Sequence, residues 1–217
     1  MKLVNFHTHL PLSNNQTGLI NHPVQLDFLP KPGQYYSAGL HPWDIPDEGS
    51  NELLKQLARL ANHSQVLAIG ECGLDRSIET PIDLQQAIFA QQIELAEKLH
   101  KPLIIHAVRT YSDLLQLKKS SRSTVPWILH GYSGNAETTR QLIKQGFFFS
   151  FGAALLKSQT KLNQSLLLVP SDRLFFETDE STVNIESIYI FAASLFGKTV
   201  NELQSTVFEN FQRIIKR

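Results

Sequence analysis

The stretch Leu3-Val4-Asn5-Phe6-His7-Thr8-His9 joins a short apolar run to two histidines that lie two positions apart. An apolar run of this length is typical of a buried strand, and side chains at i and i+2 of a strand point to the same face. Two imidazoles on one face can chelate one metal ion. A His-x-His pair also occurs by chance, so its meaning depends on the rest of the chain.

Further apolar runs of strand type follow, and segments with helical periodicity separate them. Strands are expected over residues 3–6, 35–39, 66–70, 103–106, 127–130, 147–150 and 174–178. Helices are expected over residues 52–60, 81–100, 112–119, 136–145, 161–168, 185–195 and 200–215. This alternation indicates repeated βα units around a parallel sheet. We therefore expect an α/β fold, a TIM-like (β/α) barrel.

An eight-stranded barrel needs one more strand, and the only space for it lies between His9 and Tyr35. This segment is rich in proline, and Gly18-Leu19-Ile20 is a poor candidate for a strand. It is predicted to be mainly loop. The second βα unit of the barrel should therefore be reduced or missing.

The composition sets limits on the class of protein. The chain has 217 residues, of which 42% are hydrophobic, so a single domain over residues 1–217 is expected. Twenty basic and twenty acidic residues give zero formal net charge, so a polyanion would have to be bound by a local site. Cys72 is the only cysteine, and no apolar run approaches the about 20 residues of a membrane span. With no apolar leader at the N-terminus, these features predict a cytoplasmic protein that associates with no membrane; no obligate protein partner is indicated.

Ionisable side chains stand at the ends of the expected strands. His7 and His9 close the first strand, and at the ends of later strands come Glu71, His106, His130 and Asp179. In a βα barrel the carboxyl ends of the strands form the face where active sites are built. Taken singly, His106 and His130 could be core histidines, Asp179 a helix N-cap and Glu71 a loop carboxylate. Their shared position instead indicates one metal site.

Four imidazoles and two carboxylates suit Zn²⁺, Mn²⁺ or Fe²⁺, and Mg²⁺ less well because it prefers oxygen ligands. Six ligands exceed the needs of one ion, whereas two ions about 3.5 to 4 Å apart would use them all. We expect Glu71 to bridge the two ions. One ion would be held by His7, His9 and Asp179, and the other by His106 and His130.

The order of these motifs resembles the TatD family of metal-dependent hydrolases. The matching residues are the His-x-His pair, Gly39-Leu40-His41-Pro42, Gly70-Glu71-Cys72-Gly73-Leu74-Asp75, Pro102-Leu103-Ile104-Ile105-His106, His130-Gly131-Tyr132-Ser133-Gly134 and Glu177-Thr178-Asp179. The resemblance implies an amidohydrolase-like metallo-barrel with Mg²⁺- or Mn²⁺-dependent DNase activity. It implies the same six metal ligands, with two divalent ions (Mg, Mn or Zn) as cofactors.

Two further residues take a role from this resemblance. His41 occupies a position that in the family is a pocket residue and not a ligand; it would contact the scissile phosphate or bond to its own loop. Glu177 lies two residues before Asp179, on the same strand face. It would orient a metal-bound water or pair, buried, with an arginine of the barrel.

The chain departs from the family in the residues that would meet substrate. The family commonly has an arginine two positions after the histidine that corresponds to His106, whereas here Arg109 comes three positions after His106. After Asp179 the chain continues Glu180-Ser181-Thr182-Val183-Asn184-Ile185-Glu186, which contains no cation for a phosphodiester. The metal chemistry is thus expected to be intact and substrate recognition altered.

The leading hypothesis is a two-metal phosphodiesterase or DNase, 3'-end exonuclease-like, that acts on nucleic acid or another phosphodiester. Metal-bound hydroxide would attack phosphorus, and Asp179 would serve as general base. A metal-dependent esterase or amidohydrolase, such as a D-aminoacyl-tRNA deacylase, is the alternative suggested by the altered loop. A metal-binding protein without catalysis is a third hypothesis, although such a site usually loses a ligand.

Overall fold

The structure is a computed structural model that describes residues 1–46, 48–157 and 160–215. Its strands are β1 (Leu3–Thr8), β2 (Gln16–Pro23), β3 (Tyr35–Gly39), β4 (Val66–Asp75), β5 (Leu103–Val108), β6 (Trp127–Leu129), β7 (Phe148–Phe151) and β8 (Leu174–Phe176). The hydrogen-bonded order of these eight strands is their order in the chain. A parallel bridge between Thr8 and Asp179 joins the end of β1 to the residues that follow β8. This order is that of the predicted (β/α) barrel.

The helices are α1 (Ser50–Leu60), α2 (Ile82–Leu99), α3 (Tyr111–Ser121), α4 (Ala136–Lys144), α5 (Thr160–Leu168), α6 (Ile185–Phe196) and α7 (Val200–Ile215). Three short 3₁₀ helices are η1 (Pro42–Asp44), η2 (Ala153–Lys157) and η3 (Ser171–Arg173). Each predicted helix is present. Local signals define several ends: Thr199 and Glu202 exchange the reciprocal bonds of a capping box before α7.

The segment predicted to be mainly loop contains a complete strand, so the prediction was wrong for Gly18-Leu19-Ile20. Strand β2 pairs in parallel with β1, and Gly18 stands opposite Asn5. A Cβ on Gly18 would lie 1.6 Å from the carbonyl oxygen of Asn5, so only glycine allows the two strands to approach this closely. The strand ends at Pro23, and β3 is the next element after it. The second βα unit is therefore reduced, as predicted, by loss of its helix.

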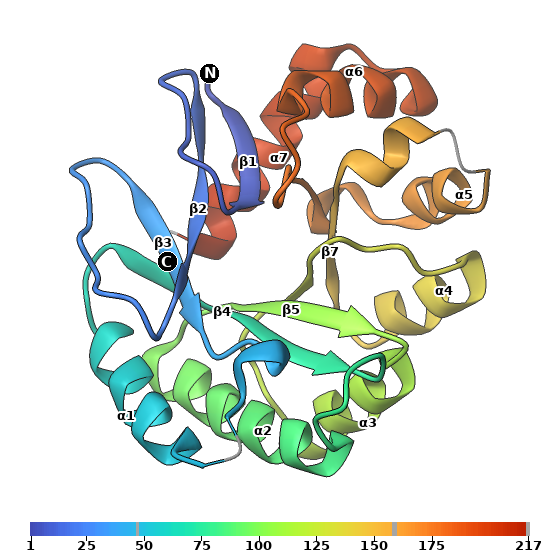
Figure 1. The fold of residues 1–217 in the computed structure, drawn as a ribbon. Helices are drawn as coiled ribbons and strands as arrows, with labels where there is room; N and C mark the ends of the chain where they lie inside the picture. Colours follow the sequence, from blue (N-terminus) through green and yellow to red (C-terminus); the bar gives the residue numbers. More distant parts are fainter. Residues whose placement is uncertain (47, 158–159, 216–217) are drawn as a thin grey trace. The chain divides into compact units, whose positions relative to one another are not determined.

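Contacts group the chain into two compact units, one formed by residues 1–20 and 129–217 and the other by residues 21–128. Strands β2 and β6 run from one unit into the other. Within the second unit, β3, β4 and β5 are parallel, and α1, α2 and α3 lie along one face of them (Figure 1). Within the first unit, β7 pairs with β8, and α7 packs against β1 and β8. A single domain over residues 1–217 stays a prediction.

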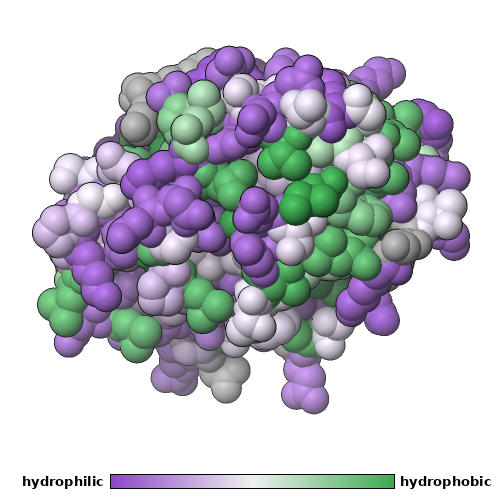
Figure 2. Space-filling view, turned by 90° about the horizontal axis from the view of Figure 1, so that it is seen from above, coloured by the Kyte–Doolittle hydropathy of each residue, from purple (hydrophilic) through white to green (hydrophobic). Residues whose placement is uncertain are grey.

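Most strands are largely buried, as is usual in parallel sheets covered by helices, whereas β2 is half-buried apart from Gly18 and Leu19. In the first unit, Phe6 of β1 stacks on Phe175 of β8 with ring centroids 4.2 Å apart, and Phe211 of α7 meets Phe6 edge-on. Hydrophobic side chains also reach the surface among the hydrophilic ones (Figure 2). The most exposed include Leu29 at 83% and Trp43 at 64%. Among the described residues, no helix combines the length and apolarity needed to cross a membrane.

The carboxylate of Glu97, near the end of α2, binds the loop that leads into β6. It accepts hydrogen bonds from the Ser123 hydroxyl at 2.5 Å, from the hydroxyl and backbone N–H of Thr124, and from the Val125 N–H at 2.9 Å. Burial alone would raise the pKa of Glu97, but these bonds outweigh it and lower the pKa to about 2. The ionised carboxylate therefore stabilises the folded state.

Replacing Glu97 by Gln should lower the free energy of unfolding at pH 7 by roughly 1–3 kcal/mol, because a charged acceptor of these bonds is lost. A carboxylate with a lowered pKa stabilises the fold above its unfolded pKa of about 4.3, and this contribution disappears as pH falls through the folded pKa. Urea unfolding should thus show a difference between wild type and E97Q that shrinks from pH 5 down to pH 2. The control is Glu94→Gln on the exposed side of α2. An equal deficit of E97Q at pH 7 and at pH 2 would contradict this account.

Candidate metal centre

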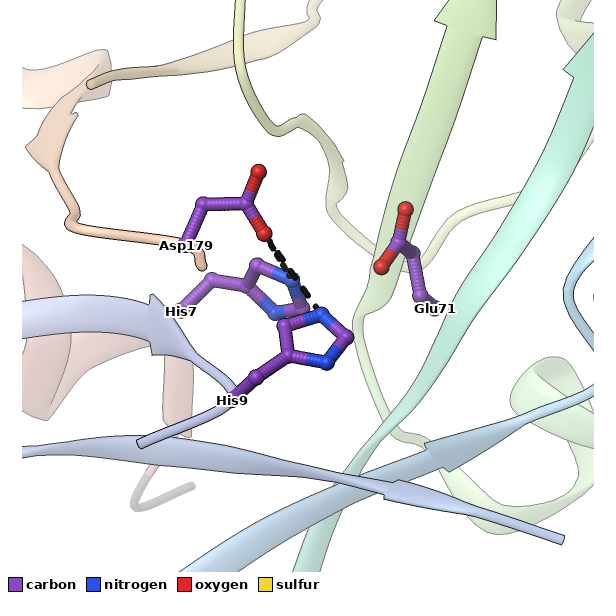
Figure 3. Close-up of side chains that lie close together, drawn as sticks. All are labelled: His7, His9, Glu71 and Asp179. Carbon is purple, nitrogen blue, oxygen red and sulfur yellow. Dashed lines mark ion pairs between the residues drawn. The ribbon is translucent and has the colours of Figure 1, made fainter. Parts of the chain in front are cut away.

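In the first unit, His7 and His9 at the end of β1 face the carboxylate of Asp179, which follows β8. The Nε2 atoms of His7 and His9 lie 3.6 and 3.5 Å from Asp179 Oδ1 (Figure 3). One ligand atom from each of the three residues lies within 4.8 Å of the others. His7 is fully buried, and the other two side chains are partly exposed. These three residues, predicted as ligands of one ion, do lie together.

The backbone holds Asp179 in place beside β1. Its N–H donates to the carbonyl of His7, and its carbonyl accepts from the N–H of His9, both at 3.1 Å. Asp179 has a φ of 53°, a left-handed conformation that is uncommon outside glycine and is found more often for Asp and Asn. Helix α6 has Asn184 as its N-cap, so Asp179 is not the helix cap that it could have been from sequence.

His130, directly after β6, lies beside His7, and one of its ring nitrogens faces Glu177. The ring centroids of His130 and His7 are 4.7 Å apart, and His130 Nδ1 lies 3.4 Å from Glu177 Oε1. Glu177 is fully buried and also accepts the N–H of Gly131. Burial alone would raise the pKa of Glu177, but its bond to His130 and the nearby imidazoles lower the pKa below the usual value. In the described part of the chain no arginine pairs with Glu177; its carboxylate lies against the His130 ring.

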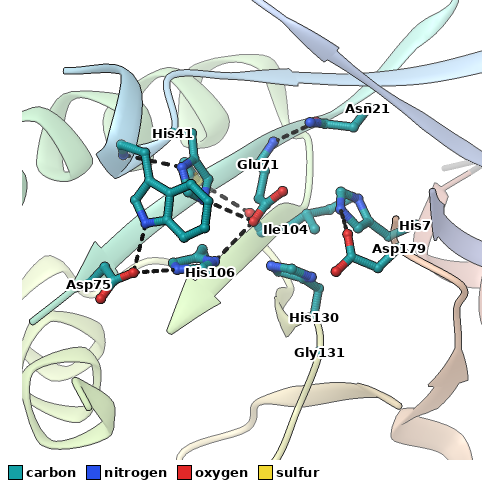
Figure 4. Close-up of polar contacts among 12 residues, drawn as sticks. His7, Asn21, His41, Glu71, Asp75, Ile104, His106, His130, Gly131 and Asp179 are labelled. Atoms are coloured by element: carbon teal, nitrogen blue, oxygen red, sulfur yellow. Dashed lines mark hydrogen bonds and ion pairs between the residues drawn. The ribbon is translucent and has the colours of Figure 1, made fainter. Parts of the chain in front are cut away.

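In the second unit, Glu71 stands between two imidazoles. Its Oε1 atom lies 3.1 Å from His41 Nε2 and 3.1 Å from His106 Nδ1 (Figure 4). One ligand atom from each of the three residues lies within 4.8 Å of the others. Glu71 lies inside β4 and His106 inside β5, because both strands continue beyond their predicted ends. Glu71 is therefore not the loop carboxylate that was the alternative from sequence.

His41 belongs to this second group, although sequence reasoning assigned it to the pocket and not to the ligands. It follows β3, and its Nδ1 accepts the backbone N–H of Trp43 at the start of η1. Its other nitrogen faces Glu71. Because Nδ1 accepts the Trp43 N–H, Nε2 is directed at the Glu71 carboxylate. His41 therefore has the position of a ligand as well as of a pocket residue.

Asp75, at the end of β4, is a site residue that sequence reasoning missed. Its buried Oδ2 lies 3.1 Å from His106 Nε2 and accepts the indole N–H of Trp43 at 2.8 Å. Burial would raise the pKa of Asp75, but bonds from Ser77, Trp43 and His106 lower the pKa well below the usual value. Glu71 and Asp75 are four positions apart in one strand, a same-face spacing visible in the sequence once β4 is extended to residue 75.

Gly73 permits this arrangement of β4 beside β5. Its φ is 136°, and a Cβ there would lie 2.2 Å from the carbonyl oxygen of His106. Any larger residue would push the two strands apart at the point where His106 meets Glu71 and Asp75.

The donor set of both groups fits divalent metal ions. Each combines imidazole nitrogens with carboxylate oxygens, which suits Zn²⁺ or Mn²⁺ and accommodates Mg²⁺ less readily. Histidines that bind metals usually have their second ring nitrogen held by a carboxylate or carbonyl. His106 has Asp75 on one nitrogen and Glu71 at the other, and His130 has Glu177.

Comparison with known proteins identifies the family. A family model described as TatD related DNase matches residues 26–216. The metal-dependent hydrolase YabD of Bacillus subtilis is 36% identical over 148 residues, covering 67% of this chain and 58% of YabD. The hydrolase YcfH of Escherichia coli is 30% identical and covers 82% of this chain and 72% of YcfH. The 3'-5' ssDNA/RNA exonuclease TatD of Cronobacter sakazakii is 32% identical over 68% of this chain and 57% of the exonuclease.

The chain thus spans little more than half the length of YabD and of the Cronobacter exonuclease. Among solved structures, the TatD homologue YjjV of Escherichia coli K12 has the same fold, with a TM-score of 0.84 at 18% identity over 99% of this chain and 98% of YjjV. A TatD family hydrolase of Entamoeba histolytica has a TM-score of 0.69 over 92% of this chain and 74% of its own. These structural matches confirm the barrel fold. The family model and the relatives YabD and YcfH show that this chain belongs to the TatD-related DNase family of metal-dependent hydrolases.

Proposed function

We propose that this chain is a divalent-metal-dependent phosphodiesterase that removes nucleotides from the 3' end of single-stranded nucleic acid. The observation that carries this proposal is that two groups of imidazoles and carboxylates form at the strands. His106 and His130 each also have a buried carboxylate partner. Such buttressed ligands are typical of catalytic metal sites. The exonuclease name of the Cronobacter relative supports the choice of substrate class.

In this proposal His7, His9 and Asp179 would hold one ion, His106 and His130 would hold the second, and Glu71 would be a ligand of both. The clustering of His7, His9 and Asp179 supports the first set. The 3.1 Å approach of His106 to Glu71 supports their sharing an ion, and the equal approach of His41 makes it an additional candidate ligand.

Bound divalent ions would supply an activated water and would neutralise charge on the phosphoryl group. The residues of the chain do the rest. Asp179 accepts the proton of the attacking water, since its carboxylate is partly exposed and its backbone is fixed by His7 and His9. His41 contacts a phosphoryl oxygen, whereas Glu177 and Asp75 keep the rings of His130 and His106 in one orientation.

Metal-loaded protein should hydrolyse bis(p-nitrophenyl) phosphate and shorten single-stranded DNA from its 3' end. His7→Ala and Asp179→Ala should each lower kcat by at least about 100-fold, because a ligand or the general base is lost. The assay is release of p-nitrophenol at verified metal occupancy, together with gel analysis of end-labelled DNA. The control is His100→Asn, at the left-handed end of α2, which should retain activity. Inactivity of the fully loaded wild type on both substrates would refute the phosphodiesterase.

One observation favours a second function, the hydrolysis of a carboxylic ester or amide as in a D-aminoacyl-tRNA deacylase. The segment after Asp179 carries Glu180 and Glu186 and no cation, which suits a reacting group with less negative charge than a phosphodiester. Rates on D-aminoacyl-tRNA and lactones, measured beside those on DNA, decide between the two. Full metal occupancy with no turnover on any of them would instead favour a binding protein.

Asp75→Asn should weaken binding of the ion at His106 by about 10- to 100-fold, because the amide no longer stabilises the second ring nitrogen as a carboxylate does. Competition with a chromophoric chelator measures this affinity, and circular dichroism checks the fold. Asp113→Asn is the matched control, since that carboxylate pairs with Arg76 instead of a histidine. Equal metal affinity of D75N and D113N would show that Asp75 does not support the ligand.

A further inference from the structure

Trp43 is an exposed aromatic residue next to the second ligand group. It lies in η1, two residues after His41, and 64% of its surface is accessible to solvent. The only other tryptophan, Trp127, is fully buried. A large apolar ring at the surface forgoes the stabilisation that burial would give it. Single exposed apolar side chains are common, so the case for Trp43 depends on how its ring is held beside the ligand group.

The indole of Trp43 is held in a fixed orientation. Its Nε1–H donates to Asp75 Oδ2 at 2.8 Å, and its backbone N–H donates to His41 Nδ1. The ring meets His41 edge-to-face with centroids 5.0 Å apart, and His106 at 5.7 Å. A hydrogen bond to Asp75 alone would need only a small polar side chain. The structure instead presents a rigid aromatic surface beside the imidazoles of His41 and His106.

We propose that Trp43 is the platform on which the terminal base of a single-stranded nucleic acid stacks while its phosphodiester reaches His41 and His106. This inference rests on the proposed phosphodiesterase function. Stacking of a base on an aromatic side chain contributes about 5- to 150-fold in affinity and needs no particular base, because every base has a π face. A base must be unpaired to stack in this way, so single-stranded ends are the substrate.

The charges around Trp43 favour stacking over ionic binding of the nucleic acid. The cation next to Asp75 in the sequence, Arg76, is already paired with Asp113 at 2.6 Å. The chain as a whole has no net charge. Apart from contacts with bound metal ions, the terminal nucleotide would then gain affinity by stacking more than by ion pairs with side chains, and binding should depend less steeply on salt than at a lysine- and arginine-rich site.

The test compares two oligothymidine strands, one ending in a base and one ending in an abasic sugar, by fluorescence anisotropy with metal-loaded protein. Trp43→Leu should weaken binding of the base-ended strand by about 5- to 150-fold and leave the abasic strand nearly unaffected. Trp43→Phe, which keeps a ring but loses the bond to Asp75, should weaken binding of the base-ended strand less. Intrinsic fluorescence should be quenched by the base-ended strand alone, since Trp127 is buried.

The matched control is Leu29→Ala, which removes another exposed apolar side chain and should bind both strands as the wild type does. Equal weakening of both strands by Trp43→Leu would mean that Trp43 acts only through Asp75, and it would overturn the proposal. No weakening of either strand, or no binding of the base-ended strand by the wild type, would overturn it too. Failure of the wild type to cleave any strand would refute the phosphodiesterase function. The role of Trp43 would still be tested by whether binding depends on the terminal base.

Discussion

The pairing of buried carboxylates with imidazoles is the interaction on which the rest of the site depends. A carboxylate removed from water is strongly destabilised unless charge and hydrogen bonds compensate it. Glu177 is fully buried and lies against His130, and Asp75 is likewise buried against His106. Each pair places an imidazole against the buried charge and at the same time fixes the ring. The buried charge thus orients an imidazole that we propose as a metal ligand.

The strands place these pairs because they are tightly packed. In β4, Glu71 and Asp75 reach the two nitrogens of one histidine of β5, and Gly73 between them lets the strands approach. Buried Cys72 and Leu74 occupy the intervening positions of the strand. Strand β4 therefore contributes side chains to the core and also a carboxylate to each nitrogen of the His106 ring.

Sequence periodicity predicted most of the fold, because short apolar runs and amphipathic segments differ clearly in period. It failed where polar residues stand inside a strand. Glu71 and His106 interrupt their apolar runs, so β4 and β5 were predicted too short and Asp75 was missed. Strand β2 was not predicted because prolines surround it, although within the strand the one proline is Pro23, at its end. The six ligand candidates were predicted because they follow apolar runs, whereas a side chain that orients one of these rings, such as Asp75, gives no such signal.

The retained charge of the carboxylates has a consequence for the order of binding. Asp75 and Glu177 have pKa values below the usual range, so both are ionised near neutral pH. These two carboxylates, beside the groups of candidate ligands, attract divalent cations and repel phosphodiesters by the same field. On the proposed function, metal ions would have to offset this charge before a nucleic acid could bind favourably. With no net charge on the chain and no cation in residues 180–186, metal binding would then be a condition for substrate binding as well as for the chemical step.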